Sequence, residues 1–246
     1  MSADVLTGWE RSSFTGAGFT RDTYRRGSGP AVIVIHEIPG ITPAVARFAN
    51  EVVDRGFTVV MPDLLGSPGK EVSGLYLAQS SLKMCIAKEF TTWALDRTSP
   101  IIAWLRALAA DLHAEVGGPG VGAIGMCFSG GFALGMMVDE AMVAPVLSQP
   151  SLPVGRGATR GNLGLSPADE ERVIERAAAG CQVLGLRFAD DGFVGTRFDT
   201  LRQKLGDAFI AIELPSRSKS DHSVLTEQRD DPSVERVLDF FVEKLH

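Results

Sequence analysis

Two short apolar runs on either side of an amphipathic stretch restrict the possible fold more than any other feature of this sequence. The runs Ala31–Ile35 and Phe57–Met61 are rich in β-branched residues, as expected of strands buried on both faces of a sheet. Pro43–Arg55 between them has helical periodicity, with Thr42 as a candidate N-cap and Gly56 just past its end. Strand, helix and strand in this order predict a βαβ unit and therefore a parallel sheet.

The alternation of strands and helices continues along the chain. Further strands are predicted at Val121–Gly125, Ala141–Leu147, Gln182–Phe188 and Phe209–Leu214. Further helices are predicted at Ile101–Val116, Phe128–Val138, Asp169–Ala179, Arg197–Leu205 and Ser233–Leu245. The pattern predicts an α/β fold, with a mostly parallel central sheet flanked by helices on both faces, in a single domain over residues 1–246. Residues 64–98 and 148–167 fit no regular period and are expected to be loops over an active site.

Composition and charge exclude several classes of partner. The formal net charge of −6 argues against nucleic acid, because phosphate binding requires clustered Lys and Arg. No apolar stretch approaches the roughly 20 residues of a membrane helix. The first residues have neither a basic start nor an apolar run, so no signal peptide is expected. We therefore expect a cytoplasmic protein without a membrane partner, present as a monomer or homodimer.

The three cysteines are Cys85, Cys127 and Cys181, an odd number at spacings unlike any zinc motif. A disulfide framework is not expected in a reducing compartment. We therefore expect no metal site, and each cysteine is either a small buried hydrophobe or a nucleophile.

The stretch from Val121 to Gly131 has the sequence of a nucleophile turn. A buried strand ends in Gly125-Met-Cys127-Phe-Ser129, and an apolar helix is expected to follow at once. The sharp turn requires small residues two positions before and two after the nucleophile, and Gly125 and Ser129 meet this requirement. The first N–H groups of the helix favour a thiolate and a developing oxyanion. The alternative is a buried structural cysteine in a glycine-rich turn, or a phosphate-binding turn, although the phosphate-binding pattern GxxxxGK[ST] does not occur.

A nucleophile of this type requires a base and an orienting acid, and the acid precedes the base in the chain. His222 is the only histidine after Cys127 that lies in a predicted loop, directly after the last predicted strand. The strand before it, Gln182–Phe188, is followed by Asp190 and Asp191. Two adjacent acids are usually turn formers, and spacing alone leaves both as candidates for the acid.

Three segments in this order resemble the dienelactone hydrolase family. Val34-Ile-His36-Glu37-Ile38-Pro-Gly40 resembles its HE-hydrophobic-x-G motif, and Gly125–Gly131 resembles its GxCxGG turn. Asp191-Gly-Phe193-Val194 resembles its D-x-x-V acid turn, which favours Asp191 over Asp190. The resemblance covers nearly the whole chain from about residue 31. It implies an α/β-hydrolase fold and the cleavage of a small-molecule carboxylic ester or lactone, without a metal or an organic cofactor.

The same resemblance assigns roles to individual residues. The catalytic residues that it implies are Cys127, Asp191, His222 and Glu37. The backbone N–H groups of Ile38 and Phe128 would form the oxyanion hole. Glu37 would lie beside the thiol, hold the resting cysteine protonated and help to ionise it when substrate binds. The alternative for Glu37 is a loop carboxylate that caps nearby N–H groups. The implied mechanism is acyl transfer through an acyl-cysteine.

The sequence departs from the family where the substrate carboxylate binds. Dienelactone hydrolases bind that carboxylate with arginines, one of them close after the catalytic histidine. Here Ser223–Glu227 follow His222, and the nearest later arginine is Arg229. Arg97 is a second candidate, although an exposed loop arginine is more often only solvated. A substrate other than dienelactone is therefore an open alternative.

Two other classes of function remain as alternatives. A non-catalytic relative could bind a small ligand or sense redox state at Cys127. A thiol–disulfide oxidoreductase would require a resolving cysteine, and neither Cys85 nor Cys181 lies in a recognisable redox motif.

Overall fold

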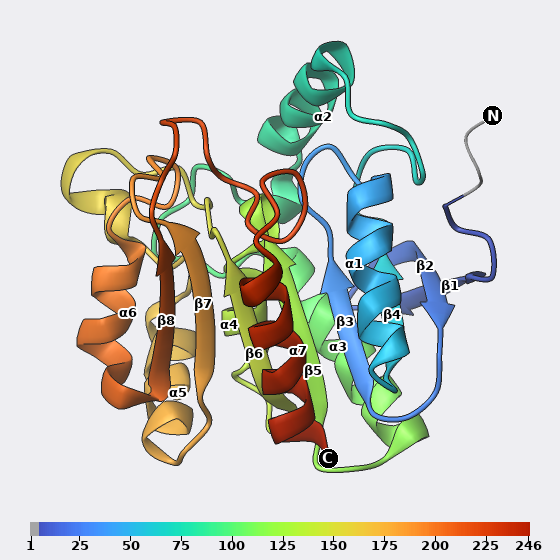
Figure 1. Cartoon of the computed structure of the whole chain (residues 1–246). Helices are drawn as coiled ribbons and strands as arrows, with labels where there is room; N and C mark the ends of the chain where they lie inside the picture. Colours follow the sequence, from blue (N-terminus) through green and yellow to red (C-terminus); the bar gives the residue numbers. More distant parts are fainter. Residues whose placement is uncertain (1–4) are drawn as a thin grey trace.

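The computed structural model describes residues 5–246, and its centre is one eight-stranded sheet with the order β1-β2-β4-β3-β5-β6-β7-β8 (Figure 1). Neighbouring strands from β4 to β8 pair in parallel, whereas β1 pairs antiparallel with β2 and β2 antiparallel with β4. The strands are β1 (Glu10–Gly16), β2 (Phe19–Arg26), β3 (Ala31–Ile35), β4 (Thr58–Pro62), β5 (Val121–Met126), β6 (Met142–Ser148), β7 (Val183–Phe188) and β8 (Phe209–Leu214).

Helices cover both faces of the sheet (Figure 1). The α-helices are α1 (Pro43–Asp54), α2 (Gly74–Ile86), α3 (Pro100–Val116), α4 (Phe132–Met136), α5 (Pro167–Ala178), α6 (Arg197–Leu205) and α7 (Asp231–Leu245). Alternate residues of β3 divide between two apolar cores: Ile33 and Ile35 pack with residues of α3 to α6, and Val32 and Val34 with residues of α1 and α7. This two-sided burial explains why the central strands are apolar at every position.

Most of the predicted architecture is confirmed. All six predicted strands and five of the six predicted helices occur, with ends within two residues of the prediction. Thr42 caps α1, because its side chain accepts the N–H of Val45 at 3.3 Å. The sixth prediction, a continuous helix over Phe128–Val138, is wrong: a 3-10 turn over Cys127–Ser129 precedes the short α4.

Four of the elements in the structure, β1, β2, α2 and a 3-10 turn, were not predicted. The antiparallel pair β1 and β2 extends the sheet beyond β4. Residues 64–98, expected to be a loop, contain α2 and a 3-10 turn, η1 (Lys88–Phe90). Ser73 caps α2 by accepting the N–H of Tyr76, and the Tyr76 hydroxyl accepts the N–H of Ser67 at 2.5 Å. These bonds hold α2 above the carboxyl ends of the central strands (Figure 1).

Candidate active site

The turn after β5 has the backbone geometry of a nucleophile elbow. Cys127 has a φ of +56°, a left-handed conformation that is uncommon for residues other than glycine. A Cβ atom at Gly125 would lie 2.0 Å from the carbonyl oxygen of Ser129, and one at Gly130 would lie 2.5 Å from the Cα of Pro150. Glycine is therefore required at both positions, whereas a Cβ at Gly131 would meet its nearest neighbour at 3.6 Å.

Ser129 stands where the family pattern has glycine, and its hydroxyl fastens the elbow to β3. The Ser129 Oγ accepts the N–H of Met126 at 2.9 Å. It also lies 3.0–3.1 Å from the carbonyl oxygens of Ile35, His36 and Met126, and its single proton bonds to one of them at a time. The family's glycine gives the backbone conformational freedom at this position, whereas Ser129 gives a buried hydrogen bond instead.

Asp191 and His222 come together from the loops after β7 and β8. The Nδ1 of His222 lies 2.6 Å from the Oδ2 of Asp191, and the other carboxylate oxygen accepts the N–H of Phe193 at 2.9 Å. The Asp191 side chain is almost completely buried. Asp190 is exposed, and its N–H bonds to Ser216. The structure therefore pairs Asp191, and not Asp190, with the histidine.

His222 contacts both the carboxylate and the thiol. Burial by itself lowers the pKa of His222, but the hydrogen bonds to Asp191 and Cys127, with their negative charges, outweigh it and raise the pKa above its ordinary value. The ring of Phe193 packs edge-on against the imidazole, with 5.4 Å between the ring centroids. The three side chains thus lie in the relative positions that a nucleophile, a base and an orienting acid would require.

These groups open into one cavity of about 550 Å³. Cys127, Phe128, His222, Glu37 and Ile38 all line it. The two residues expected to supply oxyanion-hole N–H groups therefore lie in the same cavity wall as the thiol. The loop that follows β6 also contributes to the wall and is tied to the elbow, because the N–H of Ser151 donates to the carbonyl of Cys127 at 3.0 Å.

Glu37 is buried in a polar cradle that sequence analysis did not find. Its Oε2 accepts the side chains of Ser223 at 2.8 Å and Gln149 at 3.2 Å, and its Oε1 accepts the hydroxyl of Thr226. Burial raises the pKa of Glu37, although the bonds from Thr226 and Ser223 oppose the rise. Ser223 and Thr226 lie one and four residues after His222, in the segment where a substrate-binding arginine was expected.

His36 joins the loops that follow β3 and β4. Its Nε2 accepts the N–H of Leu64 at 3.1 Å, so the proton resides on Nδ1, which donates to the carbonyl of Glu37 at 2.8 Å. Burial lowers the pKa of His36 to about 4, against the raising effect of this backbone bond. The neutral ring therefore holds the loop that carries Glu37 and Ile38.

The structure does not bring the two candidate arginines into the cavity wall. Arg97 is exposed on the segment between η1 and α3. Arg229 forms ion pairs with Glu51 at 3.1 Å and Asp231 at 2.7 Å. Neither is among the described residues that line the cavity with Cys127.

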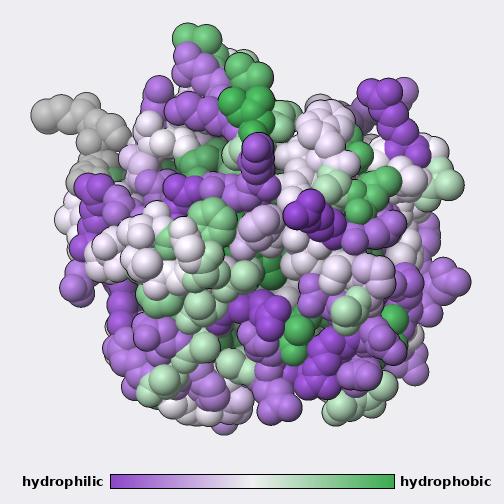
Figure 2. All heavy atoms as spheres, turned by 180° about the vertical axis from the view of Figure 1, so that it is seen from behind, coloured by the Kyte–Doolittle hydropathy of each residue, from purple (hydrophilic) through white to green (hydrophobic). Residues whose placement is uncertain are grey.

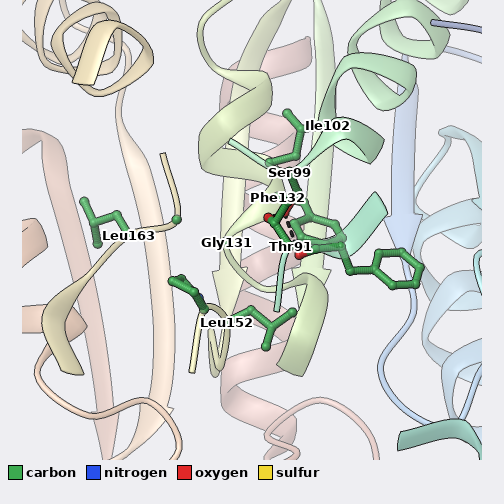
Figure 3. Close-up of a pocket in the computed structure, with 10 residues that line it drawn as sticks. Thr91, Ser99, Ile102, Gly131, Phe132, Leu152 and Leu163 are labelled. Atoms are coloured by element: carbon green, nitrogen blue, oxygen red, sulfur yellow. Dashed lines mark hydrogen bonds between the residues drawn. The ribbon is translucent and has the colours of Figure 1, made fainter. Parts of the chain in front are cut away.

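A second, much smaller cavity lies behind the elbow, lined by Gly131, Phe132 and Leu152 among others (Figure 3). The hydroxyls of Thr91 and Ser99 in its wall lie 2.6 Å apart, within hydrogen-bond distance. Its volume of about 10 Å³ is that of a single water at most, so it is not a substrate site.

Among residues 5–246, no helix combines the length and apolarity needed to span a bilayer.

Comparisons with known proteins agree with this geometry. The model of the family described as "Dienelactone hydrolase family" matches residues 20–243. A dienelactone hydrolase from Anabaena variabilis has a TM-score of 0.65 and 15% identity, with 97% of this chain and 98% of that chain covered. A cold-adapted esterase from an Arctic intertidal metagenomic library gives 0.63 and 17%, with 97% and 94% covered.

The esterase Pf2001 from Pyrococcus furiosus gives a TM-score of 0.61 and 13% identity, with 98% of this chain and 95% of that chain covered. At these identities the solved structures establish the shared α/β-hydrolase fold. No curated protein matched the chain. The family model, which covers nearly the whole chain, establishes membership: this chain belongs to the dienelactone hydrolase family and is a carboxylic ester hydrolase.

Proposed function

We propose that this protein cleaves a carboxylic ester or lactone of a small molecule through a covalent acyl-cysteine, as a dienelactone hydrolase-like enzyme. The observation that carries the proposal is the 2.6 Å contact between Asp191 and His222, together with a cysteine of φ +56° that lines the same cavity as His222. A strained elbow, a paired histidine and a substrate-sized cavity are the components that acyl transfer requires.

In the proposed first step, the Cys127 thiolate attacks the carbonyl carbon of the ester. The N–H groups of Ile38 and Phe128 stabilise the oxyanion, and the protonated His222 gives its proton to the departing alkoxide. The product is a thioester on Cys127. In the second step, His222 takes a proton from water and the hydroxide attacks the thioester. The carboxylic acid is released, and the Cys127 thiolate and the protonated His222 are restored. Asp191 keeps the imidazole in the correct tautomer throughout.

We assign Glu37 the role of controlling the ionisation of the thiol. Its burial, its raised pKa and its place in the cavity wall support this role. The test is Glu37→Gln, followed by the rate at which iodoacetamide alkylates Cys127 across the pH range. The role predicts a changed pH dependence of alkylation, whereas a Glu37 that only caps its neighbours would leave the pH dependence unchanged in a folded variant.

The central experiment compares the intact protein with Cys127→Ala on p-nitrophenyl butyrate and on a dienelactone. Cysteine catalysis predicts a fall in kcat/KM of at least about a thousandfold, because no other nucleophile replaces the thiol. After acid quenching, mass spectrometry of the whole protein should detect one butyryl group on the protein that retains Cys127 and none on Cys127→Ala. Cys181→Ala is the matched control, because the Sγ of Cys181 lies 3.8 Å from the carbonyl oxygens of Met142 and Val143, outside the cavity wall.

If both proteins are inert on both compounds, the alternative of a ligand-binding or redox-sensing relative replaces the proposal. Equal activity in both would make Cys127 structural.

We also propose that residues 1–246 form one domain that acts in the cytoplasm as a monomer or homodimer. Light scattering after size-exclusion chromatography measures the oligomeric state directly.

A further inference from the structure

We infer that the cavity selects neutral esters with an apolar acyl chain and disfavours esters that carry a second carboxylate. This inference rests on the proposed ester hydrolysis and specifies the substrate class of the same site. It is carried by the apolar side chains of the cavity wall, by the charges beside them, and by the bonds that hold the two arginines of an adjoining cavity.

The helix α2 supplies one wall of the cavity. Leu77, Ser81 and Met84 lie at intervals of four and three residues, so they share one face of the helix, and all three line the cavity. Val72, just before the helix, lines it as well. Leu77 is still 42% exposed, so part of its apolar surface remains for a substrate to cover.

The opposite wall comes from the loops after β6 and β7. Leu152, Val154 and Phe193 line it, and Phe193 is 73% exposed although it is a large aromatic side chain. The outer face of α2 is a different surface, which carries Leu75, Leu82 and Ile86. Figure 2 shows hydrophobic residues gathered at the top of the molecule, where α2 lies. An acyl chain between the two walls would cover apolar side chains on both sides.

The charged side chains that line the cavity are acidic, apart from the catalytic histidine. Glu227 and Glu37 both contribute to the wall, and within residues 5–246 no Lys or Arg does so. The charge of Glu227 acts on Glu37: burial raises the pKa of Glu37, and the negative charge of Glu227 adds to the rise. A substrate carboxylate in this cavity would lose water and meet like charge without a cationic partner.

Two arginines face a separate cavity of about 150 Å³ that adjoins the catalytic one. Arg160 and Arg197 line that cavity, which shares only Ser151, Val154 and Phe193 with the catalytic one. The guanidinium of Arg197 is buried and donates to the carbonyl oxygens of Asn162, Phe193, Val194 and Pro153. Arg160 donates to the carbonyl of Gly192 at 2.8 Å. These bonds engage both guanidinium groups with loop backbone, and neither arginine is among the described residues that line the catalytic cavity.

The test uses two p-nitrophenyl esters that differ only at the far end of the acyl chain. The hexanoate ends in a methyl group and the adipate half-ester ends in a carboxylate, while the leaving group and the chain length are the same. We expect kcat/KM for the hexanoate to exceed that for the half-ester at least about tenfold at low ionic strength, and the ratio to fall as salt is added. From acetate to hexanoate, each added CH₂ should raise kcat/KM up to about fourfold.

Two substitutions attribute the selectivity to the cavity wall. Glu227→Gln removes a negative charge and should lower the hexanoate to half-ester ratio. Leu77→Ser removes part of the apolar wall from a half-exposed position and should flatten the dependence on chain length. Arg160→Ala is the control for the neighbouring cavity and should leave the ratio unchanged.

The outcomes separate this inference from the proposed function. If neither ester is turned over in a manner that depends on Cys127, the proposed function itself fails. If the half-ester is turned over as well as the hexanoate or better, ester hydrolysis stands and the inference on substrate class is overturned. A preference for the half-ester that disappears in Arg160→Ala would instead assign an anion subsite to the neighbouring cavity.

Discussion

Acid should destabilise this protein through His36, a buried histidine beside the catalytic loop. The ring is completely buried, and its two nitrogens are committed to the N–H of Leu64 and the carbonyl of Glu37. A second proton on the ring would abolish the acceptor at Nε2 and place a charge in the core. The pKa of His36 therefore falls from 6.5 to about 4 in the folded state, where burial is the dominant cause.

The size of the effect follows from these two values. In the unfolded chain the histidine binds a proton as the pH falls through 6.5, whereas the folded protein binds it only near pH 4. Acid therefore favours the unfolded state, with a loss that begins below pH 6.5 and is complete near pH 4. At about 1.4 kcal/mol per pH unit, the difference corresponds to about 3 kcal/mol of unfolding free energy.

Urea unfolding at neutral pH and at steps down to pH 4 measures this loss. Burial raises the pKa of both Asp63 and Glu37, so these two groups have the opposite effect on stability as the pH falls. The informative quantity is therefore the loss of unfolding free energy in the natural protein minus the loss in His36→Gln. The glutamine amide forms hydrogen bonds but does not titrate in this range. If both lose the same free energy between neutral pH and pH 4, His36 is not held neutral by burial and the reasoning is wrong.

Three further predictions follow from single contacts. Gly125→Ala should lower the free energy of unfolding, measured by chemical denaturation, by more than about 2 kcal/mol, because the new Cβ would lie 2.0 Å from the carbonyl oxygen of Ser129. The control is Gly74→Ala, which has open space around it and should change the free energy of unfolding by less than about 0.5 kcal/mol. Asp191→Asn should keep the fold but lower kcat/KM at least about a hundredfold in an ester assay, because the amide does not stabilise the charged imidazole; an unchanged rate would remove Asp191 from the mechanism. Arg197→Leu should lower the unfolding free energy by about 3 kcal/mol, because four loop carbonyls lose their donor, and a loss below about 1 kcal/mol would contradict this account.

The parallel core could be predicted because each central strand is buried on both faces. Ala31–Ile35 and Val183–Phe188 are short runs with few polar residues, which is the pattern expected of strands buried on both faces. The hairpin of β1 and β2 could not be found in this way, because both of its strands are largely polar, and β1 is mostly exposed while β2 is mostly half-buried. The helix α2 was missed for the opposite reason: it carries apolar side chains on its outer face as well as its inner face, which hides the helical period.

At the site, local chemistry was easier to predict than long-range contacts. The backbone requirement for Gly125 is contained in the turn itself, and the need for a histidine and an acid after the nucleophile restricted the search to a few residues. The cradle around Glu37 depends on Gln149 and Thr226, which are 112 and 189 residues away in the sequence. No local sequence pattern predicts such a contact. The continuous helix predicted after Cys127 is wrong because the chain first forms a 3-10 turn there.

The N-terminal hairpin determines how the sheet meets other molecules of the same protein. Every side chain of β4 is buried, and β2 covers the edge of β4 that β3 does not pair with. The outermost strand, β1, is instead mostly exposed and polar, with Arg11 paired to Asp22 of β2. Proteolysis or truncation that removed the hairpin would uncover a row of unpaired backbone groups on an apolar strand, which is a template for intermolecular strand pairing. We therefore expect the hairpin that completes this edge of the sheet also to protect the enzyme from aggregation.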